Sequence, residues 1–207
     1  MEDVKTGTTT LGMVCKDGII LAADKRATAG GFIASKDVDK VVMVSDSIAI
    51  TTAGSVSEIQ LFIKLLRAEL KLKNIKTNRI NTVKEAANIS SRMVYETARQ
   101  YFSGVTHFLM AGYDKQGIHL YEIYPDGTLV EVKDYVSSGS GSPLVYGIFE
   151  HTYKDAITIK EGEELAVKAI SASMQRDSYS GNGIDVMVIT KDNIKKTVQK
   201  KVTSVIA

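Results

Sequence analysis

The sequence has one cysteine, no tryptophan, two prolines and three histidines among its 207 residues. A single cysteine cannot form an intramolecular disulfide, and so few thiols fit a reducing compartment, so we expect a cytoplasmic protein. No apolar run reaches the about 18 residues that a membrane-spanning helix needs. The net charge of +2 is too small to indicate a nucleic-acid partner. These absences exclude a disulfide scaffold and disfavour membrane and nucleic-acid binding.

Few side chains in the sequence are suited to bind a metal. The histidines His107, His119 and His151 do not have the spacing of metal ligands, so we expect no metal and no other cofactor. Cys15 lies in an alternating strand pattern, which favours a structural role. The lysine-rich run 191–201 is interpreted as a solvent-exposed face.

The content of 44% apolar and 24% charged residues is typical of one soluble globular domain. Apolar runs predict strands at residues 9–15, 18–23, 40–44, 48–53, 107–113, 118–124, 128–132 and 184–190. Helices are predicted behind capping-box patterns at Ser55, Thr82 and Thr158 and behind Ser142-Pro143, with the second helix ending at Gly104. This order of strands and helix pairs predicts an α+β fold with helices packed on antiparallel sheets.

A glycine followed by three threonines, Gly7-Thr8-Thr9-Thr10, comes near the start of the chain. If the bond between Gly7 and Thr8 is cut, Thr8 acquires a free α-amine beside its own hydroxyl. One residue then carries a base and a nucleophile together. The pattern alone is also that of an ordinary strand start, which is the more frequent case. Polar clusters at the ends of the predicted strands favour the interpretation of Thr8 as a nucleophile over that of a simple strand start.

Asp24 ends an apolar strand, and Lys40 begins the next strand pair. A salt bridge between them would be purely structural, or it would place an ammonium beside a nucleophile and lower the nucleophile's pKa. Gly54 precedes a helix start, so its N–H is a candidate oxyanion donor, although a simple turn explains this glycine equally well. The hydroxyl-rich loops 139–142 and 178–181 lack the Gly-Lys-Ser or Gly-Lys-Thr of a phosphate-binding loop.

Taken together, these segments resemble the β subunits of proteasomes, most closely the archaeal type. The resemblance spans nearly the whole chain, and the segments that carry it are Gly7–Thr10, Asp24–Thr28, Thr52–Gly54, 138–143 and 176–181. It implies a threonine peptidase of the N-terminal-nucleophile hydrolase family, with a four-layer αββα sandwich of two antiparallel sheets flanked by helices.

The resemblance also implies a role for each matching residue. Residues 1–7 would be a prosegment removed by self-cleavage, and residues 8–207 would form a single catalytic domain with Thr8 as nucleophile. The other implied catalytic residues are Asp24, Lys40, Ser140, Asp177 and Ser180, with the Gly54 N–H as oxyanion donor. The implied substrate-binding residues are Ala27, Thr28, Val38, Val42, Thr52 and Val56. Because these side chains are small and mostly uncharged, we expect cleavage after apolar residues.

The partners implied by the resemblance are proteasome α subunits and other β subunits in stacked heptameric rings, a regulatory ATPase that acts through the α ring, and unfolded proteins as substrates. No nucleic acid or membrane is implied. Two alternatives stay open. One is a bacterial-type two-ring peptidase of the same fold, and the other is an unprocessed structural β subunit that assembles beside an active paralogue.

Overall fold

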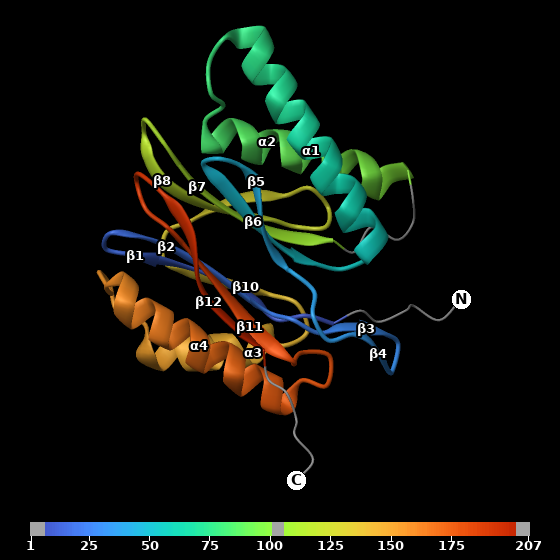
Figure 1. The fold of residues 1–207 in the computed structure, drawn as a ribbon, viewed down its shortest axis with the longest axis vertical. Coiled ribbons are helices and arrows are strands. Elements are labelled where there is room, and N and C mark those ends of the chain that lie inside the picture. The colour runs from blue at the N-terminus through green and yellow to red at the C-terminus, as the bar shows by residue number, and fades with distance from the viewer. Residues whose placement is uncertain (1–6, 101–105, 202–207) are drawn as a thin grey trace.

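The computed structural model describes residues 7–100 and 106–201 (Figure 1). In this part of the chain, two five-stranded antiparallel sheets lie face to face, and a pair of helices covers the outer side of each. The predicted α+β sandwich of four layers is therefore confirmed. The expected helix end at Gly104 and most of the proposed prosegment lie outside the described residues.

The first sheet has the strand order β10-β1-β2-β11-β12 and the second has the order β5-β6-β7-β8-β9. The strands of the first sheet are β1 (Thr10–Cys15), β2 (Gly18–Asp24), β10 (Tyr135–Ser138), β11 (Gly183–Ile189) and β12 (Ile194–Lys201). Those of the second sheet are β5 (Val41–Ser45), β6 (Ile48–Ala53), β7 (His107–Asp114), β8 (Gly117–Ile123) and β9 (Leu129–Val132). A short hairpin is formed by β3 (Ala27–Ala29) and β4 (Phe32–Ser35).

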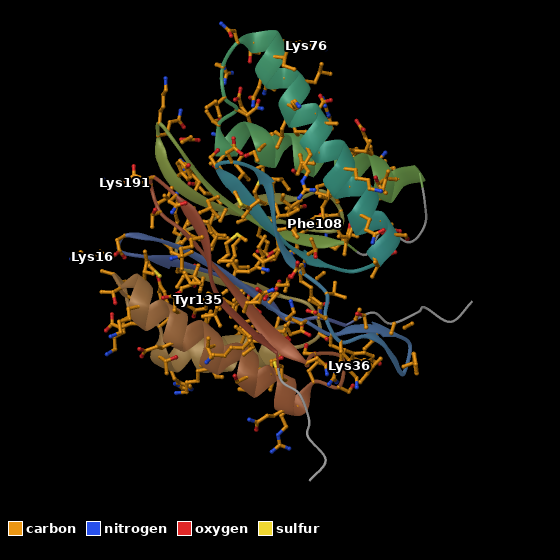
Figure 2. All side chains as sticks on the ribbon, viewed as in Figure 1. Lys16, Lys36, Lys76, Phe108, Tyr135 and Lys191 are labelled. Carbon is orange, nitrogen blue, oxygen red and sulfur yellow. The ribbon has the colours of Figure 1, made fainter. Side chains whose placement is uncertain are left out.

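Helices α1 (Val56–Thr77) and α2 (Val83–Gln100) cover the second sheet, and α3 (Ser142–Thr152) and α4 (Ile159–Arg176) cover the first (Figure 1). Under α1, Phe62 stacks on Phe108 with ring centroids 4.2 Å apart, and Figure 2 shows Phe108 in this layer. Under α3, Tyr135 packs edge-on against Phe149. A third apolar cluster, which includes Leu21 and Leu109, fills the space between the sheets. Apolar side chains are therefore buried in three places, between each helix pair and its sheet and between the two sheets, and this burial stabilises the layers.

Two of the three predicted capping boxes form. At Thr82 and at Thr158 the side chain accepts the N–H of the glutamate three residues later, and that glutamate accepts the N–H of the threonine. The prediction is wrong at Ser55, whose side chain caps no N–H in the described structure and lies 3.2 Å from the Ser57 hydroxyl instead. The Ser55 side chain is therefore oriented towards a neighbouring side chain and not towards a backbone N–H of the helix start.

Four strands were not predicted, and β12 is the most instructive of them. Residues 194–201 form an edge strand of the first sheet, in which Ile194 and Val198 pack against buried residues. Lysines are common on edge strands because their charge discourages pairing with another chain. The interpretation of 191–201 as a purely solvent-exposed face is therefore wrong for Lys196, which is three-quarters buried and ion-paired.

No helix within residues 7–100 and 106–201 is both long enough and apolar enough to cross a membrane. In the same part of the chain, no group of three or more histidine, cysteine, aspartate and glutamate side chains is arranged to hold a metal ion.

Candidate active site

Thr8 lies two residues before β1 begins at Thr10, and it is buried. Its hydroxyl donates a hydrogen bond of 2.7 Å to the Gly7 carbonyl oxygen, and its N–H donates one of 3.2 Å to the Ser140 hydroxyl. The next residue, Thr9, donates its N–H to the Asp24 carboxylate at 3.0 Å. The start of β1 is thus fixed by bonds to segments that are distant in the sequence.

Asp24 at the end of β2 and Lys40 just before β5 form a buried ion pair, with 2.7 Å between Lys40 Nζ and Asp24 Oδ1. The Asp24 carboxylate also accepts the N–H groups of Thr9, Arg26 and Gly181. A buried charge is tolerated when it is paired and its remaining lone pairs are satisfied, and both conditions hold here. The pair predicted from the sequence therefore forms.

Two opposing effects act on the Lys40 ammonium. Burial lowers the pKa of Lys40, while the charge of Asp24 and its hydrogen bond raise it, and burial is the larger effect. A buried lysine whose pKa is lowered can give up or share a proton more readily than an exposed one. Lys40 and Thr8 line the same pocket, and Asp24 Oδ1 accepts both the Lys40 ammonium and the N–H of Thr9, the residue after Thr8.

Hydroxyl groups link Thr8 to Asp177. The Ser140 hydroxyl accepts the Thr8 N–H and donates to Asp177 Oδ2 at 2.6 Å. The Ser180 hydroxyl donates to the same carboxylate oxygen at 2.6 Å and lies 2.6 Å from the Thr9 hydroxyl. The three residues that the resemblance placed around the threonine nitrogen are therefore close to it in the structure.

Sequence reasoning missed two members of this network, Thr9 and Ser173. The Thr9 hydroxyl lies 2.5 Å from the Ser173 hydroxyl, which comes from the buried face of α4. Gly141 makes this possible, because a Cβ there would lie 2.0 Å from each of these two oxygens. A serine in the middle of a helix gives no local signal of such a role, so only the packing of α4 against β1 shows it.

A pocket of about 130 Å³ opens beside Thr8. Five of the six residues expected to bind substrate line it, namely Ala27, Thr28, Val38, Thr52 and Val56, together with Gly54. Val42 is not part of the lining that the described residues form, and it packs instead against the core under α1. The lining residues that the sequence did not indicate are Arg26, Asp39, Ile59, Gln60 and Ile63.

The Thr28 hydroxyl in the pocket wall contacts the backbone that precedes Thr8. It accepts the N–H of Gly7 at 3.3 Å, so the backbone before Thr8 is already bound by a residue of the pocket wall. Gly54 has a φ of 126°, a conformation that favours glycine, at the point where β6 leads into α1.

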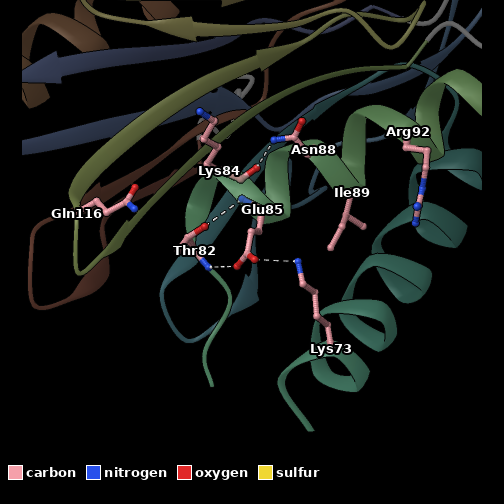
Figure 3. A pocket seen from close by; sticks show the side chains of 8 residues that line it. All are labelled: Lys73, Thr82, Lys84, Glu85, Asn88, Ile89, Arg92 and Gln116. Atoms are coloured by element: carbon pink, nitrogen blue, oxygen red, sulfur yellow. Dashed lines mark hydrogen bonds and ion pairs between the residues drawn. The ribbon is translucent and has the colours of Figure 1, made fainter. Parts of the chain in front are cut away.

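A larger hollow of about 560 Å³ lies between the end of α1 and the start of α2 (Figure 3). Its walls carry the cations Lys73, Lys84 and Arg92, and Figure 3 shows Glu85 bonded to Lys73. Glu85 also bonds Arg79 at 2.6 Å, and these contacts lower its pKa. Glu85 of α2 thereby joins α2 to Lys73 of α1. The connected network of hydroxyl, carboxylate and ammonium groups described above lies at Thr8 and not in this hollow.

The chain matches the family model described as "Proteasome subunit" over residues 4–189. It is 41% identical to "Proteasome subunit beta" of Ferroglobus placidus, over 99% of this chain and 97% of the relative. It is 42% identical to the protein of the same name from Archaeoglobus profundus, over 100% of this chain and 95% of the relative. The corresponding protein of Methanosarcina mazei is 41% identical over 96% and 93%. The resemblance seen in the sequence is thus confirmed, and the chain belongs to the proteasome subunit family, among β subunits of archaeal type.

Proposed function

We propose that this chain is a catalytic β subunit that hydrolyses peptide bonds with Thr8 as an N-terminal nucleophile. The proposal rests on one arrangement above all. Thr8 is bonded through Ser140 to Asp177 and shares its pocket with Lys40, whose ammonium is paired with the buried Asp24. This brings a hydroxyl, a cation and a hydrogen-bonded site for an amine together at one residue.

Self-cleavage is the first proposed step. The Thr8 hydroxyl already lies against the Gly7 carbonyl, at 2.7 Å from its oxygen. A change in the side-chain torsion would direct Oγ at the carbonyl carbon. Addition there, followed by breakage of the C–N bond, leaves residues 1–7 as an ester on Oγ and frees the Thr8 amine. Water then hydrolyses this ester and releases the segment that ends at Gly7.

Hydrolysis of a substrate would follow the same path in trans. The free α-amine, with an ordinary pKa of about 7.7–8.0, takes the proton from Oγ near neutral pH. Oγ adds to the substrate carbonyl, and the Lys40 ammonium stabilises the charge that develops on it. The Gly54 N–H is the proposed donor to the oxyanion, a type of contact whose loss typically costs about 3 kcal/mol. The amine product leaves with the proton, and water cleaves the ester.

The roles of Ser140, Asp177 and Ser180 follow from their hydrogen bonds. Ser140 donates to Asp177, so its lone pairs are directed at the Thr8 nitrogen. After cleavage this nitrogen is a free amine, and the Ser140 hydroxyl can still accept a hydrogen bond from it. The Ser180 hydroxyl donates a hydrogen bond to the same oxygen of Asp177 and thereby helps to fix the position of that carboxylate.

The pocket walls favour an apolar substrate side chain, because the apolar residues Val38, Val56, Ile59 and Ile63 are part of the lining. We further propose that the chain assembles with proteasome α subunits and other β subunits in stacked heptameric rings in the cytoplasm. A regulatory ATPase acting through the α ring would supply unfolded proteins as substrates.

Replacement of Thr8 tests the proposal directly. The assembled particle with Thr8→Ala should retain residues 1–7 by intact mass and should not cleave fluorogenic peptides. Thr97→Ala, which alters an exposed helix position, is the matched control and should behave like the wild type. Peptide cleavage by the Thr8→Ala particle at the wild-type rate would overturn the proposal.

A further inference from the structure

A second group of charges, two buried and two partly exposed, lies next to the Asp24–Lys40 pair. Lys25 is 1% exposed, and its Nζ lies 3.1 Å from Asp39 Oδ1 and 3.1 Å from Asp185 Oδ2. Lys196 Nζ reaches the same two oxygens at 3.1 and 3.2 Å. Two lysines and two aspartates thus form a closed ring of alternating charge, which we call the Lys25 ring. Asp37 adds a further contact to Lys25 at 3.0 Å.

The Lys25 ring joins parts of the fold that the sheets do not connect. Lys25 follows β2, Asp185 lies on β11 and Lys196 lies on β12, all in the first sheet. Asp39 belongs to the segment that leads into β5 of the second sheet. Asp39 is therefore the point at which the ring holds the second sheet to the first.

Lys40 is the neighbour of Asp39 and must cross the same gap. It enters the second sheet through β5, yet its ammonium has to meet Asp24 at the end of β2 in the first sheet. The backbone supports the same alignment, because the Val38 N–H donates to the Lys25 carbonyl at 3.0 Å. The position of residues 38–40 relative to β2 therefore decides whether the 2.7 Å contact of Lys40 forms.

We propose that Lys25, Asp39, Asp185 and Lys196 are positioning residues for the Thr8 chemistry, which hold the Lys40 ammonium at Asp24 and beside the threonine. This inference rests on the proposed function. None of the four residues would touch the reacting atoms. Their effect would pass through Lys40, so loss of the ring should slow the chemical step and leave substrate binding largely intact.

The test uses assembled particles with Lys196→Met or Asp39→Asn, because both side chains are partly exposed and their loss leaves Lys25 with other carboxylates. We expect kcat for a short fluorogenic peptide to fall by about tenfold in both variants, as for a misplaced catalytic group. KM should stay close to the wild-type value in Lys196→Met, which is the variant that decides on substrate binding because Asp39 also lines the pocket beside Thr8. Lys196→Arg, which keeps the charge and the donors, should restore most of kcat. Lys195→Met is the matched control, because Lys195 is an exposed neighbour with no ion pair among the described residues.

A second measurement does not depend on activity. Hydrogen exchange of the Val38 amide, followed by mass spectrometry of peptides that span residues 36–40, should become faster in Asp39→Asn and Lys196→Met. The double variant should lose no more kcat than the stronger single variant, since both changes break the same ring.

Three results would overturn the inference while leaving the proposed function intact. The first is an unchanged kcat in both variants, and the second is faster exchange without any loss of kcat, which would make the ring merely structural. The third is a higher KM at constant kcat, which would assign the ring to substrate binding. A wild-type particle that is no more active than Thr8→Ala would instead overturn the proposed function, and the inference with it.

Discussion

The Thr8 hydroxyl lies 2.7 Å from the carbonyl oxygen of Gly7, the residue on the other side of the proposed cleavage site. The nucleophile and the bond that it is proposed to cut are therefore in contact within one chain. Because Gly7 is also held by Thr28, the carbonyl has little freedom to turn away. Self-cleavage should for this reason depend strongly on the shape of the space around Gly7.

Gly7→Ala should slow processing by about tenfold or more, because even a small displacement of a reacting group is costly. A Cβ at residue 7 would lie 1.9 Å from Tyr179 Cβ and 2.8 Å from Ser140 Oγ. Intact mass measured over time after assembly follows the loss of residues 1–7. Gly31→Ala is the control, because nothing lies within 4 Å of the added methyl group.

The clash at Gly7 can also be relieved. Combining Gly7→Ala with Tyr179→Gly removes the Tyr179 Cβ and Cγ atoms that the new methyl group would meet. This double variant should be processed faster than Gly7→Ala alone. If Gly7→Ala is processed at the wild-type rate, the contact with Tyr179 has no bearing on cleavage.

Lys40→Ala should lower kcat by about 100-fold or more, in the range seen when one electrostatic contact to a transition state is removed. The fold should survive with a lower Tm, because the buried Asp24 loses its cation but keeps the N–H groups of Thr9, Arg26 and Gly181. Peptide hydrolysis and thermal unfolding of the assembled particle give the two readouts. Lys36→Ala, an exposed lysine labelled in Figure 2, should change neither. Equal kcat values for the two alanine variants would contradict the role of Lys40.

Asp39 should make stability sensitive to strong acid. Burial raises its pKa, but hydrogen bonds from Lys25 and Lys196 outweigh this effect and lower the pKa from 3.8 to about 2. A carboxyl with a depressed folded-state pKa stabilises the fold above its unfolded pKa, and this contribution is lost as the pH falls through the folded value. The Tm difference between the wild type and Asp39→Asn should therefore be constant above about pH 5 and shrink between pH 3.8 and 2. A Tm difference that persists unchanged to pH 2 would contradict this.

Cys15 should resist alkylation in the folded protein. The side chain is 5% exposed, and burial together with the nearby charges of Asp17 and Glu163 raises the pKa of its thiol to about 12. Since the thiolate is the reactive form, iodoacetamide at neutral pH should label the native protein hardly at all and the urea-unfolded protein fully. Lys195→Cys provides an exposed thiol as a positive control. Rapid labelling of native Cys15 would show that the thiol is accessible.

Local sequence patterns predicted much of the fold. The eight predicted strands all occur within one or two residues of their expected bounds, because each carries its own apolar pattern. The capping boxes at Thr82 and Thr158 could be predicted because all their atoms lie within four consecutive residues. Strands such as β10, which is only four residues long and ends in two serines, depend on a distant partner strand and carry no such pattern.

The residues of the candidate site likewise include some that local motifs indicate and others that only distant contacts reveal. Motifs indicated Thr8, Asp24 and Lys40, and the structure brings these residues together. Ser173 was missed because its partner Thr9 is 164 residues away in the sequence. Val42 was expected in the pocket, but strand β5 alternates, and Val42 packs towards α1 while its neighbour Val41 lies between the sheets.

Two short segments near Thr8, Asp24-Lys25 and Asp39-Lys40, pair with each other through opposite charges. Asp24 meets Lys40 and Lys25 meets Asp39, so both segments have an aspartate followed by a lysine and they pair in opposite directions. If the segments slipped by one residue, either Asp24 would face Asp39 or Lys25 would face Lys40, depending on the direction of the slip. Each slip would separate the opposite charges and bring two like charges together, one of them on a buried side chain, which a folded protein tolerates poorly. The charged pairs beside Thr8 thus also set the register between the two segments, because they stabilise one alignment of the sheets and destabilise the alignments one residue away.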